Sequence, residues 1–115
     1  MQNDMKSEIS IKPFRECRAA AALPGSKSIT NRAMILAAIA GGRTVLEGAL
    51  FSRDTLIMAD CLRKLGYMVR LDSDAKRIEI ESAGSGIPNS SAEMDVGNAG
   101  TAARFVTAFV ALRKG

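Results

Sequence analysis

A short segment near the start of the chain combines residue types that suit the binding of an anion. Residues 24–32 read Pro-Gly-Ser-Lys-Ser-Ile-Thr-Asn-Arg, so a turn containing glycine leads directly into a helical pattern. The free N–H groups and the dipole of a helix N-terminus favour negative charge. Lys27 adds a point charge, Ser28 adds a hydroxyl, and Arg32 follows one helical turn later with a planar fork for an oxyanion. The segment predicts a cradle for phosphate or carboxylate.

The same segment does not fit a nucleotide-binding P-loop. That motif requires Gly directly before its Lys and a second Gly five residues earlier. This chain has Ser26 and Ala21 at those two places. A purely structural alternative stays open, in which residues 24–26 form a turn and a helix cap while Lys27 and Arg32 are only solvated.

A second segment repeats this logic near the end of the chain. Residues 97–104 read Gly-Asn-Ala-Gly-Thr-Ala-Ala-Arg and lead into another helical pattern. The small residues allow a close approach of the backbone, Thr101 or Asn98 is expected to cap the helix, and Arg104 follows one turn later. An ordinary capped helix is the alternative. Two such helix openings favour a ligand with two anionic groups, or two anionic ligands.

The elements that must position these segments are a mixture of helices and strands. Alternation of apolar and polar residues predicts strands, and apolar residues at helical spacing predict helices. The expected order is a short strand at 9–11 that ends at Pro13, a helix over 29–40, a strand over 44–51, a helix over 53–65 capped by Ser52, a hairpin of strands at 68–71 and 77–81, and a last helix after Thr101. This order indicates an α/β or α+β unit.

The apolar stripes of the helices are expected to face the core. In the first helix the stripe comprises Ile29, Ala33, Leu36, Ala37 and Ala40; in the second it comprises Leu56, Ala59, Leu62 and Leu65; in the last it comprises Ala102, Phe105, Val106, Phe109 and Leu112. Cys61, on the second helix, is expected to be a small buried hydrophobe. The stripe of the last helix is expected to lack partner strands, so that the chain has marginal stability.

The composition excludes several kinds of site. The 115 residues contain no His, which excludes a Ser-His-Asp triad, a His general base and a His-ligated metal within this chain. Cys17 and Cys61 are the two cysteines, and they cannot form a disulfide framework or a tetrahedral zinc site alone. They fit a reducing compartment, so we expect a cytoplasmic protein without a metal.

Charge and hydropathy restrict the expected partners. The net charge of +4 arises in residues 1–53, which hold eight Lys/Arg against four Asp/Glu, whereas residues 54–115 hold eight of each. This bias suits a small phosphate-bearing ligand, although a surface with a slight Arg surplus is the alternative. Aromatic residues make up 4% of the chain, which is too few for a nucleic-acid stacking platform. The chain has no long apolar run and no apolar secretory region, so no membrane partner is expected.

The two helix openings resemble the signatures of the 5-enolpyruvylshikimate-3-phosphate (EPSP) synthase family. Residues 23–33 are similar to the first signature nearly throughout, and residues 97–102 are similar to the second. The order and spacing also fit, so the resemblance covers about residues 9–115. The sister family, the UDP-N-acetylglucosamine enolpyruvyl transferases, is less similar, because Asn usually follows the Lys there and this chain has Ser28.

The resemblance implies an incomplete part of a larger α/β enzyme. Family members are much longer and have two similar domains, each an inside-out α/β barrel of three βαβαββ units. By resemblance, residues 1–25 would form a strand and hinge that join the other domain. Residues 26–115 would form a partial substrate-binding domain, with the first βαβαββ unit at 26–96 and the start of the second at 97–115. The family's acid–base residues would lie outside this chain, so we expect an N-terminal fragment that is inactive alone.

The reaction implied by the resemblance joins phosphoenolpyruvate to the 5-hydroxyl of shikimate 3-phosphate and releases phosphate. It belongs to aromatic amino acid biosynthesis and uses addition and elimination without a cofactor. Carried over by motif position, Lys27 would contact both substrates and take part in catalysis. Ser28 and Arg32 would hold shikimate 3-phosphate.

The second signature would line the phosphoenolpyruvate pocket. Asn98, Gly100 and Thr101 would lie around that substrate, together with Lys27, and Arg104 would support the loop from behind. Glyphosate binds in this pocket in the family, and Gly100 leaves room for such a compact inhibitor. The sequence departs from the family where Phe105 follows Arg104, because many members have Pro there.

The partners implied by the resemblance are the two small-molecule substrates and the remainder of the enzyme, which is expected to be a monomer. Acidic residues of the chain are expected to be surface charges without a catalytic role: Asp54, Asp60, Glu79 and Glu81. Two alternatives stay open. One is a stand-alone anion-binding domain that uses the same two loops, and the other is a fragment of the sister amino-sugar transferase.

Overall fold

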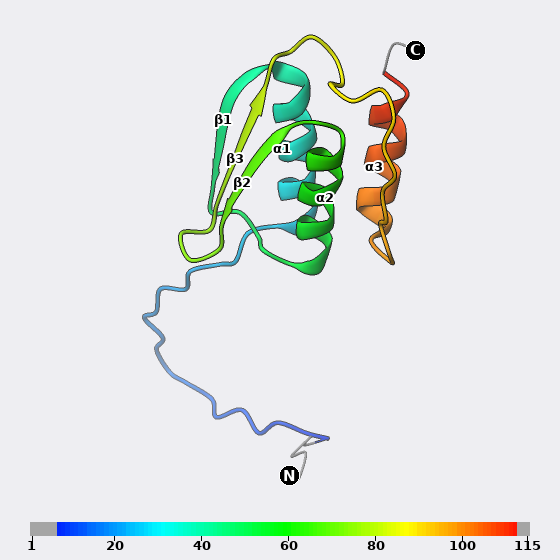
Figure 1. Ribbon diagram of the computed structural model, residues 1–115. Helices are drawn as coiled ribbons and strands as arrows, with labels where there is room; N and C mark the ends of the chain where they lie inside the picture. The colour runs from blue at the N-terminus through cyan, green and yellow to red at the C-terminus, as the bar shows by residue number, and fades with distance from the viewer. Residues whose placement is uncertain (1–6, 113–115) are drawn as a thin grey trace.

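The computed structural model describes residues 7–112 and shows three layers (Figure 1). A three-stranded sheet forms the first layer, two helices pack on one of its faces, and the last helix packs on those two helices. The order in this part of the chain is α1 (Lys27–Ala40), β1 (Gly42–Glu47), α2 (Arg53–Lys64), β2 (Met68–Asp72), β3 (Arg77–Ser82) and α3 (Gly100–Val110). The expected mixture of helices and strands is confirmed.

The sheet has the order β1-β3-β2, and β3 is antiparallel to both neighbours. In the register, Ile78 of β3 lies between Leu46 of β1 and Leu71 of β2. Ile78 and Ile80 are buried under the helices, whereas Glu79 points to the other face because side chains alternate along a strand. The hairpin expected at 68–71 and 77–81 is confirmed.

Local capping signals explain where α1 and α2 begin. The Ser26 hydroxyl accepts a hydrogen bond from the Ile29 N–H at 3.3 Å. At α2, Ser52 and Thr55 form a capping box in which each side chain accepts a hydrogen bond from the other residue's backbone N–H. A side-chain cap satisfies N–H groups that have no partner within the helix. The expected cap at Ser52 is therefore confirmed.

The buried face of α1 differs from the expected stripe. Ala37 is buried as expected, but Ile29 and Leu36 are 66% and 64% exposed. The core positions are instead Thr30, Asn31, Met34, Ala37 and Ala38. Two of these are polar, so a pattern of apolar residues cannot identify the face. In α2, Ala59 and Leu62 are buried as expected, as is Leu65 at its C-cap; Leu56 is 46% exposed, and Cys61 is fully buried.

The last helix contacts no strand within residues 7–112, as expected, but two helices cover its apolar stripe. Ala102, Val106 and Phe109 are buried against α1 and α2. The ring of Phe109 also lies 5.9 Å from the ring of Tyr67. Leu112 remains 63% exposed. Helices rather than strands supply this cover.

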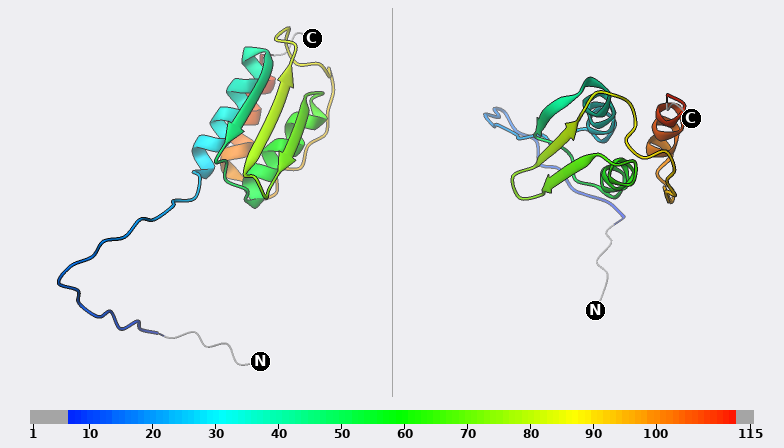
Figure 2. Two further views of the ribbon diagram at one scale, coloured as in Figure 1. Left: turned by 90° about the vertical axis from the view of Figure 1, so that its left-hand side faces the viewer. Right: turned by 45° about the horizontal axis from the view of Figure 1, so that its top comes forward.

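Two expected strands differ from the structure. Residues 7–24 form no strand, and every one of them is exposed, including the apolar residues Ile9, Ile11, Phe14 and Leu23. Figure 2 shows this segment leading away from the start of α1. A strand needs a hydrogen-bonding neighbour, and none of the described residues provides one. The strand expected at 44–51 begins earlier, at Gly42, and ends at Glu47.

Candidate functional site

The first turns of all three helices lie at one end of the molecule (Figure 1), and we call this end the N-terminal face. Lys27 begins α1 and forms an ion pair with Asp54, the second residue of α2. Arg32 and Phe105 are each the sixth residue of their helices, α1 and α3, and they are also in contact. Each contact joins residues that lie a similar number of positions from the start of their helices. The three helices therefore run parallel, and their first turns lie side by side.

A tight contact between two loops sets the position of α1. A Cβ atom on Gly25 would lie 2.8 Å from the Leu50 nitrogen and within 3.0 Å of other backbone atoms of the β1–α2 loop. Only glycine allows this approach without a shift of the backbone. Thr30 completes the contact, because its hydroxyl accepts a hydrogen bond from the Leu50 N–H at 3.1 Å. The glycine of the first segment therefore holds the start of α1 against the loop that leads to Asp54.

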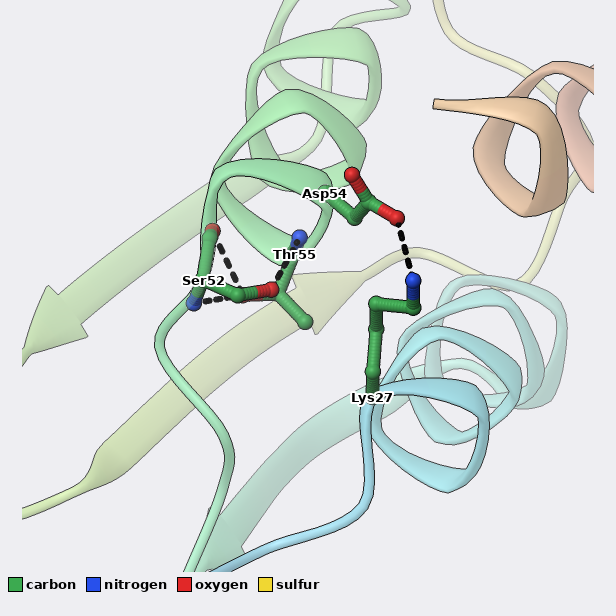
Figure 3. Close-up of polar contacts among 4 residues, drawn as sticks. All are labelled: Lys27, Ser52, Asp54 and Thr55. Atoms are coloured by element: carbon green, nitrogen blue, oxygen red, sulfur yellow. Dashed lines mark hydrogen bonds and ion pairs between the residues drawn. The ribbon is translucent and has the colours of Figure 1, made fainter. Parts of the chain in front are cut away.

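Lys27 projects across the N-terminal face toward α2 (Figure 3). Its Nζ lies 2.8 Å from Oδ2 of Asp54, and the two side chains are 47% and 22% exposed. Asp54 lies in the first turn of α2, where the helix dipole stabilises a carboxylate. Asp54 was expected to be a surface charge, and its pairing with Lys27 was not predicted. Its position two residues after the Ser52 cap was the available signal.

Ser28 and Arg32 lie on the side of α1 that borders α3. Ser28 is half-buried, and Arg32 is exposed one turn further along. The Cζ atom of Arg32 lies over the Phe105 ring, 5.9 Å from its centroid. No ion pair joins Arg32 to any other residue in 7–112. The structure thus brings Lys27, Ser28 and Arg32 to one end of one helix, as the first segment predicts.

The start of α3 differs from the other two helix starts. Its N-cap is Ala99, which has no side chain able to cap, so the expected capping by Thr101 or Asn98 was wrong. The Gly97 N–H donates to the Asp95 carboxylate, and the Gly100 N–H donates to the Asn98 carbonyl. The first turn of α3 therefore lacks a side-chain cap on its N–H groups. Asn98 and Gly100 are exposed, and Thr101 is half-buried.

Two further arginines are Arg104 of α3 and Arg53 of α2. Arg104 is exposed, on the side of α3 opposite the buried Ala102 and Val106, and the structure does not bring it to Lys27. Arg53, at the start of α2, was not singled out. Its Nη2 lies 3.4 Å from where a Cβ of Gly97 would be, so it lies against the loop before α3.

The N-terminal face is electropositive. It carries Lys27, Arg32 and Arg53 against the carboxylates of Asp54 and of Asp95, which lies in the loop before α3, and the first turns of α1 and α3 contain no acidic residue. Three parallel helix dipoles add partial positive charge at the same end. This arrangement can bind an anionic ligand with fixed cations and oriented N–H groups.

One buried polar side chain lies close to this face. Asn31 follows Lys27 by one turn and is fully buried, and neither of its amide atoms has a hydrogen-bond partner among residues 7–112. Burying an unpartnered amide costs about 1–3 kcal/mol. Asn31 was not among the residues expected in the core.

Other titratable groups lie away from the N-terminal face. The hydrogen bond from Arg43 lowers the pKa of Glu79 on the outer face of the sheet, with a smaller contribution from Arg70. Burial raises the pKa of the Cys61 thiol. No group of three or more His, Cys, Asp or Glu within residues 7–112 could hold a metal ion, and no helix there is long and apolar enough to cross a membrane.

Comparisons with known proteins agree on one family. The family model for EPSP synthase (3-phosphoshikimate 1-carboxyvinyltransferase) matches residues 11–115. The chain is 48% identical over 101 residues to the 3-phosphoshikimate 1-carboxyvinyltransferase of Trichormus variabilis, covering 88% of this chain and 24% of that protein. It is 46% identical over 107 residues to the enzyme of that name from Bordetella avium, and the match covers 93% of this chain and 24% of that protein. The chain is also 43% identical over 109 residues to the chloroplastic 3-phosphoshikimate 1-carboxyvinyltransferase of Arabidopsis thaliana. This match covers 90% of this chain and 21% of that protein. The chain thus spans about a quarter of the length of these relatives.

Proposed function

The chain belongs to the EPSP synthase family, and on this premise we propose that it contributes one half-site of an enolpyruvyl transferase. The reaction moves the enolpyruvyl group of phosphoenolpyruvate onto the 5-hydroxyl of shikimate 3-phosphate and releases phosphate. The observation that carries the proposal is the convergence of three helix N-termini around Lys27. Both substrates are anions, so an electropositive end with fixed donors is the feature that they require.

Lys27 is the proposed catalytic residue, and it binds both substrates. Asp54 orients the ammonium group from α2, so that Lys27 lies across the N-terminal face rather than extending freely into solvent. Ser28 and Arg32 bind the phosphate of shikimate 3-phosphate, since a hydroxyl and a guanidinium one turn apart can both reach one oxyanion.

The start of α3 is the proposed site for phosphoenolpyruvate. Its first turn lacks a side-chain cap, so N–H groups there can donate to a carboxylate or phosphate. Asn98, Gly100 and Thr101 line this site together with Lys27, and Arg104 supports the loop through charge. The same pocket is proposed to accept glyphosate, because Gly100 has no atoms within 4 Å of its missing Cβ position.

Preorganised charge is the contribution that these residues make to catalysis. Fixed cations and N–H groups stabilise the charge that develops on the reacting anions without reorganising during the reaction. The proposed mechanism needs no metal or cofactor. Acid–base residues are assigned to the remainder of the enzyme, so the 115-residue chain is proposed to bind substrate without turning it over.

The place of the chain in the whole enzyme follows from the same premise. Residues 26–96 are proposed to belong to the first βαβαββ unit of an inside-out barrel, to which they contribute α1, β1, α2, β2 and β3, and residues 97–115 are proposed to begin the second. Residues 1–25 join the other domain. Exposed apolar side chains at Ile9, Ile11 and Phe14 support this assignment, because such side chains are usually covered by another surface. The whole enzyme is proposed to be a monomer.

A stand-alone anion-binding domain is the second candidate function. It is favoured by the packing of α3, whose Ala102, Val106 and Phe109 are buried within the described part of the chain. Because α1 and α2 already bury the apolar side of α3, this helix does not require another polypeptide to pack against.

Calorimetric titration of the 115-residue chain tests the proposal. Shikimate 3-phosphate should bind, and Lys27→Ala should weaken binding at least ten-fold because a charged hydrogen bond is lost. Lys64→Ala is the matched control, since Lys64 lies in the last turn of α2 at the opposite end. Equal affinity of Lys27→Ala and the wild type would refute the proposal. Preference for inorganic phosphate over shikimate 3-phosphate would favour the anion-binding domain, and preference for UDP-N-acetylglucosamine would favour the sister transferase.

A further inference from the structure

The guanidinium of Arg32 has one fixed neighbour, the aromatic ring of Phe105. Its Cζ lies 5.9 Å from the ring centroid, within the range of a cation–π contact. No ion pair joins Arg32 to another residue in the described part of the chain. A free, exposed Arg side chain populates many rotamers, and ordering it costs conformational entropy. Contact with the ring restricts these rotamers before any ligand arrives.

Phe105 is itself held in place. It is half-buried on α3, next to Val106 and one turn before Phe109, which are both buried against α1 and α2. Arg32 and Phe105 border an apolar groove of about 380 Å³ between α1 and α3. The other side chains that line the groove are Ile35, Leu36, Ile39, Ala108, Phe109 and Leu112. The ring is therefore a fixed platform, whereas Arg32 is the long and flexible partner.

A cation–π contact leaves hydrogen-bond donors available. The ring attracts the guanidinium through its π face and accepts none of the five N–H groups in a conventional hydrogen bond. Arg32 can thus rest on Phe105 and still present N–H groups to an oxyanion near Ser28, one turn earlier on the same side of α1.

We propose that Phe105 is a positioning residue for Arg32, which it holds ready for the phosphate of the substrate. The proposal rests on the function assigned to Arg32 above. It also joins the two segments, because a residue of the second segment's helix orders a residue of the first.

Binding measurements on the 115-residue chain test the proposal. Phe105→Leu removes the ring and keeps most of its volume, whereas Phe105→Tyr keeps the ring. The dissociation constant for shikimate 3-phosphate should rise about two- to five-fold in Phe105→Leu and return to the wild-type value in Phe105→Tyr. Leu112→Ala, an exposed position in the same groove, is the control and should leave the affinity unchanged.

A double-mutant cycle separates positioning from a general loss of structure. In an Arg32→Ala background, Phe105→Leu should have no further effect on affinity, because the group that it orders is gone. An equal loss in both backgrounds, or wild-type affinity in Phe105→Leu, would overturn the proposal.

A ligand-free measurement keeps this proposal distinguishable from the proposed function. NMR relaxation of the Arg32 Nε–Hε group should show greater order in the wild type and Phe105→Tyr than in Phe105→Leu. If the wild type binds no shikimate 3-phosphate but this difference is found, the proposed function fails while the contact that orders Arg32 stands. If Arg32 is equally mobile in all three proteins, Phe105 does not position it.

Discussion

Replacement of Gly25 by Ala should disrupt the contact on which the N-terminal face depends. The added Cβ would lie 2.8 Å from the Leu50 nitrogen and 3.0 Å from the Ala49 carbonyl carbon. Both are backbone atoms, so no flexible side chain can move aside. Overpacking of this kind costs about 1–3 kcal/mol. Loss of the Leu50–Thr30 hydrogen bond adds about 1 kcal/mol, so Gly25→Ala should lower the free energy of unfolding by about 2–4 kcal/mol.

Urea unfolding followed by circular dichroism gives this free energy directly. The matched control is Gly100→Ala, because nothing lies within 4 Å of the position of its Cβ. That substitution replaces Gly with a better helix former at the start of α3 and should be neutral or stabilising by up to about 1 kcal/mol. The affinity for shikimate 3-phosphate should also fall in Gly25→Ala, since the β1–α2 loop leads to Asp54. A Gly25→Ala protein within about 0.5 kcal/mol of the wild type would refute this account of the first segment.

Three further substitutions test the packing and charge of the fold. Phe109→Ala should cost about 3–5 kcal/mol in urea unfolding, whereas Leu112→Ala, which is exposed, should cost much less; equal losses would contradict the docking of α3. Asn31→Leu should stabilise the protein by about 1 kcal/mol, because a buried amide without a partner is removed; a clear loss of stability would show that the amide is satisfied. The pKa of Glu79 is lowered in the folded state, so its stabilisation is complete above its ordinary value of 4.5 and disappears as the pH falls through the folded-state pKa. Glu79→Gln should flatten this acid dependence of the melting temperature, and an unchanged profile would contradict it.

The sequence predicted the features that local chemistry determines. The Ser52 cap, the end of α1 at residue 40 and the alternation along β3 all depend on neighbours within a few residues, and the structure confirms each of them. The two helix openings were found for the same reason. Their residue types are placed around a helix start, where dipole and spacing can be read directly from the order of residues.

The features that were missed depend on contacts between elements. Thr30 and Asn31 occupy core positions of α1 because the helix is covered by the sheet, α2 and α3 together, and apolar periodicity does not reveal which sides are covered. The pairing of Lys27 with Asp54 requires two helix starts to be level, which only the packing determines. The strand expected at 9–11 fails for a related reason, since alternation predicts a strand but cannot supply the neighbouring strand that it needs.

The central claim is that shikimate 3-phosphate binds at the start of α1, through Lys27, Ser28 and Arg32. Backbone amide NMR shifts of the 115-residue chain, recorded as shikimate 3-phosphate is added, test it most directly. The shifts at Lys27, Ser28 and Arg32 should saturate with one dissociation constant. Shifts confined to the Arg43 and Arg70 cluster on the outer face of the sheet, or none at millimolar ligand, would contradict it.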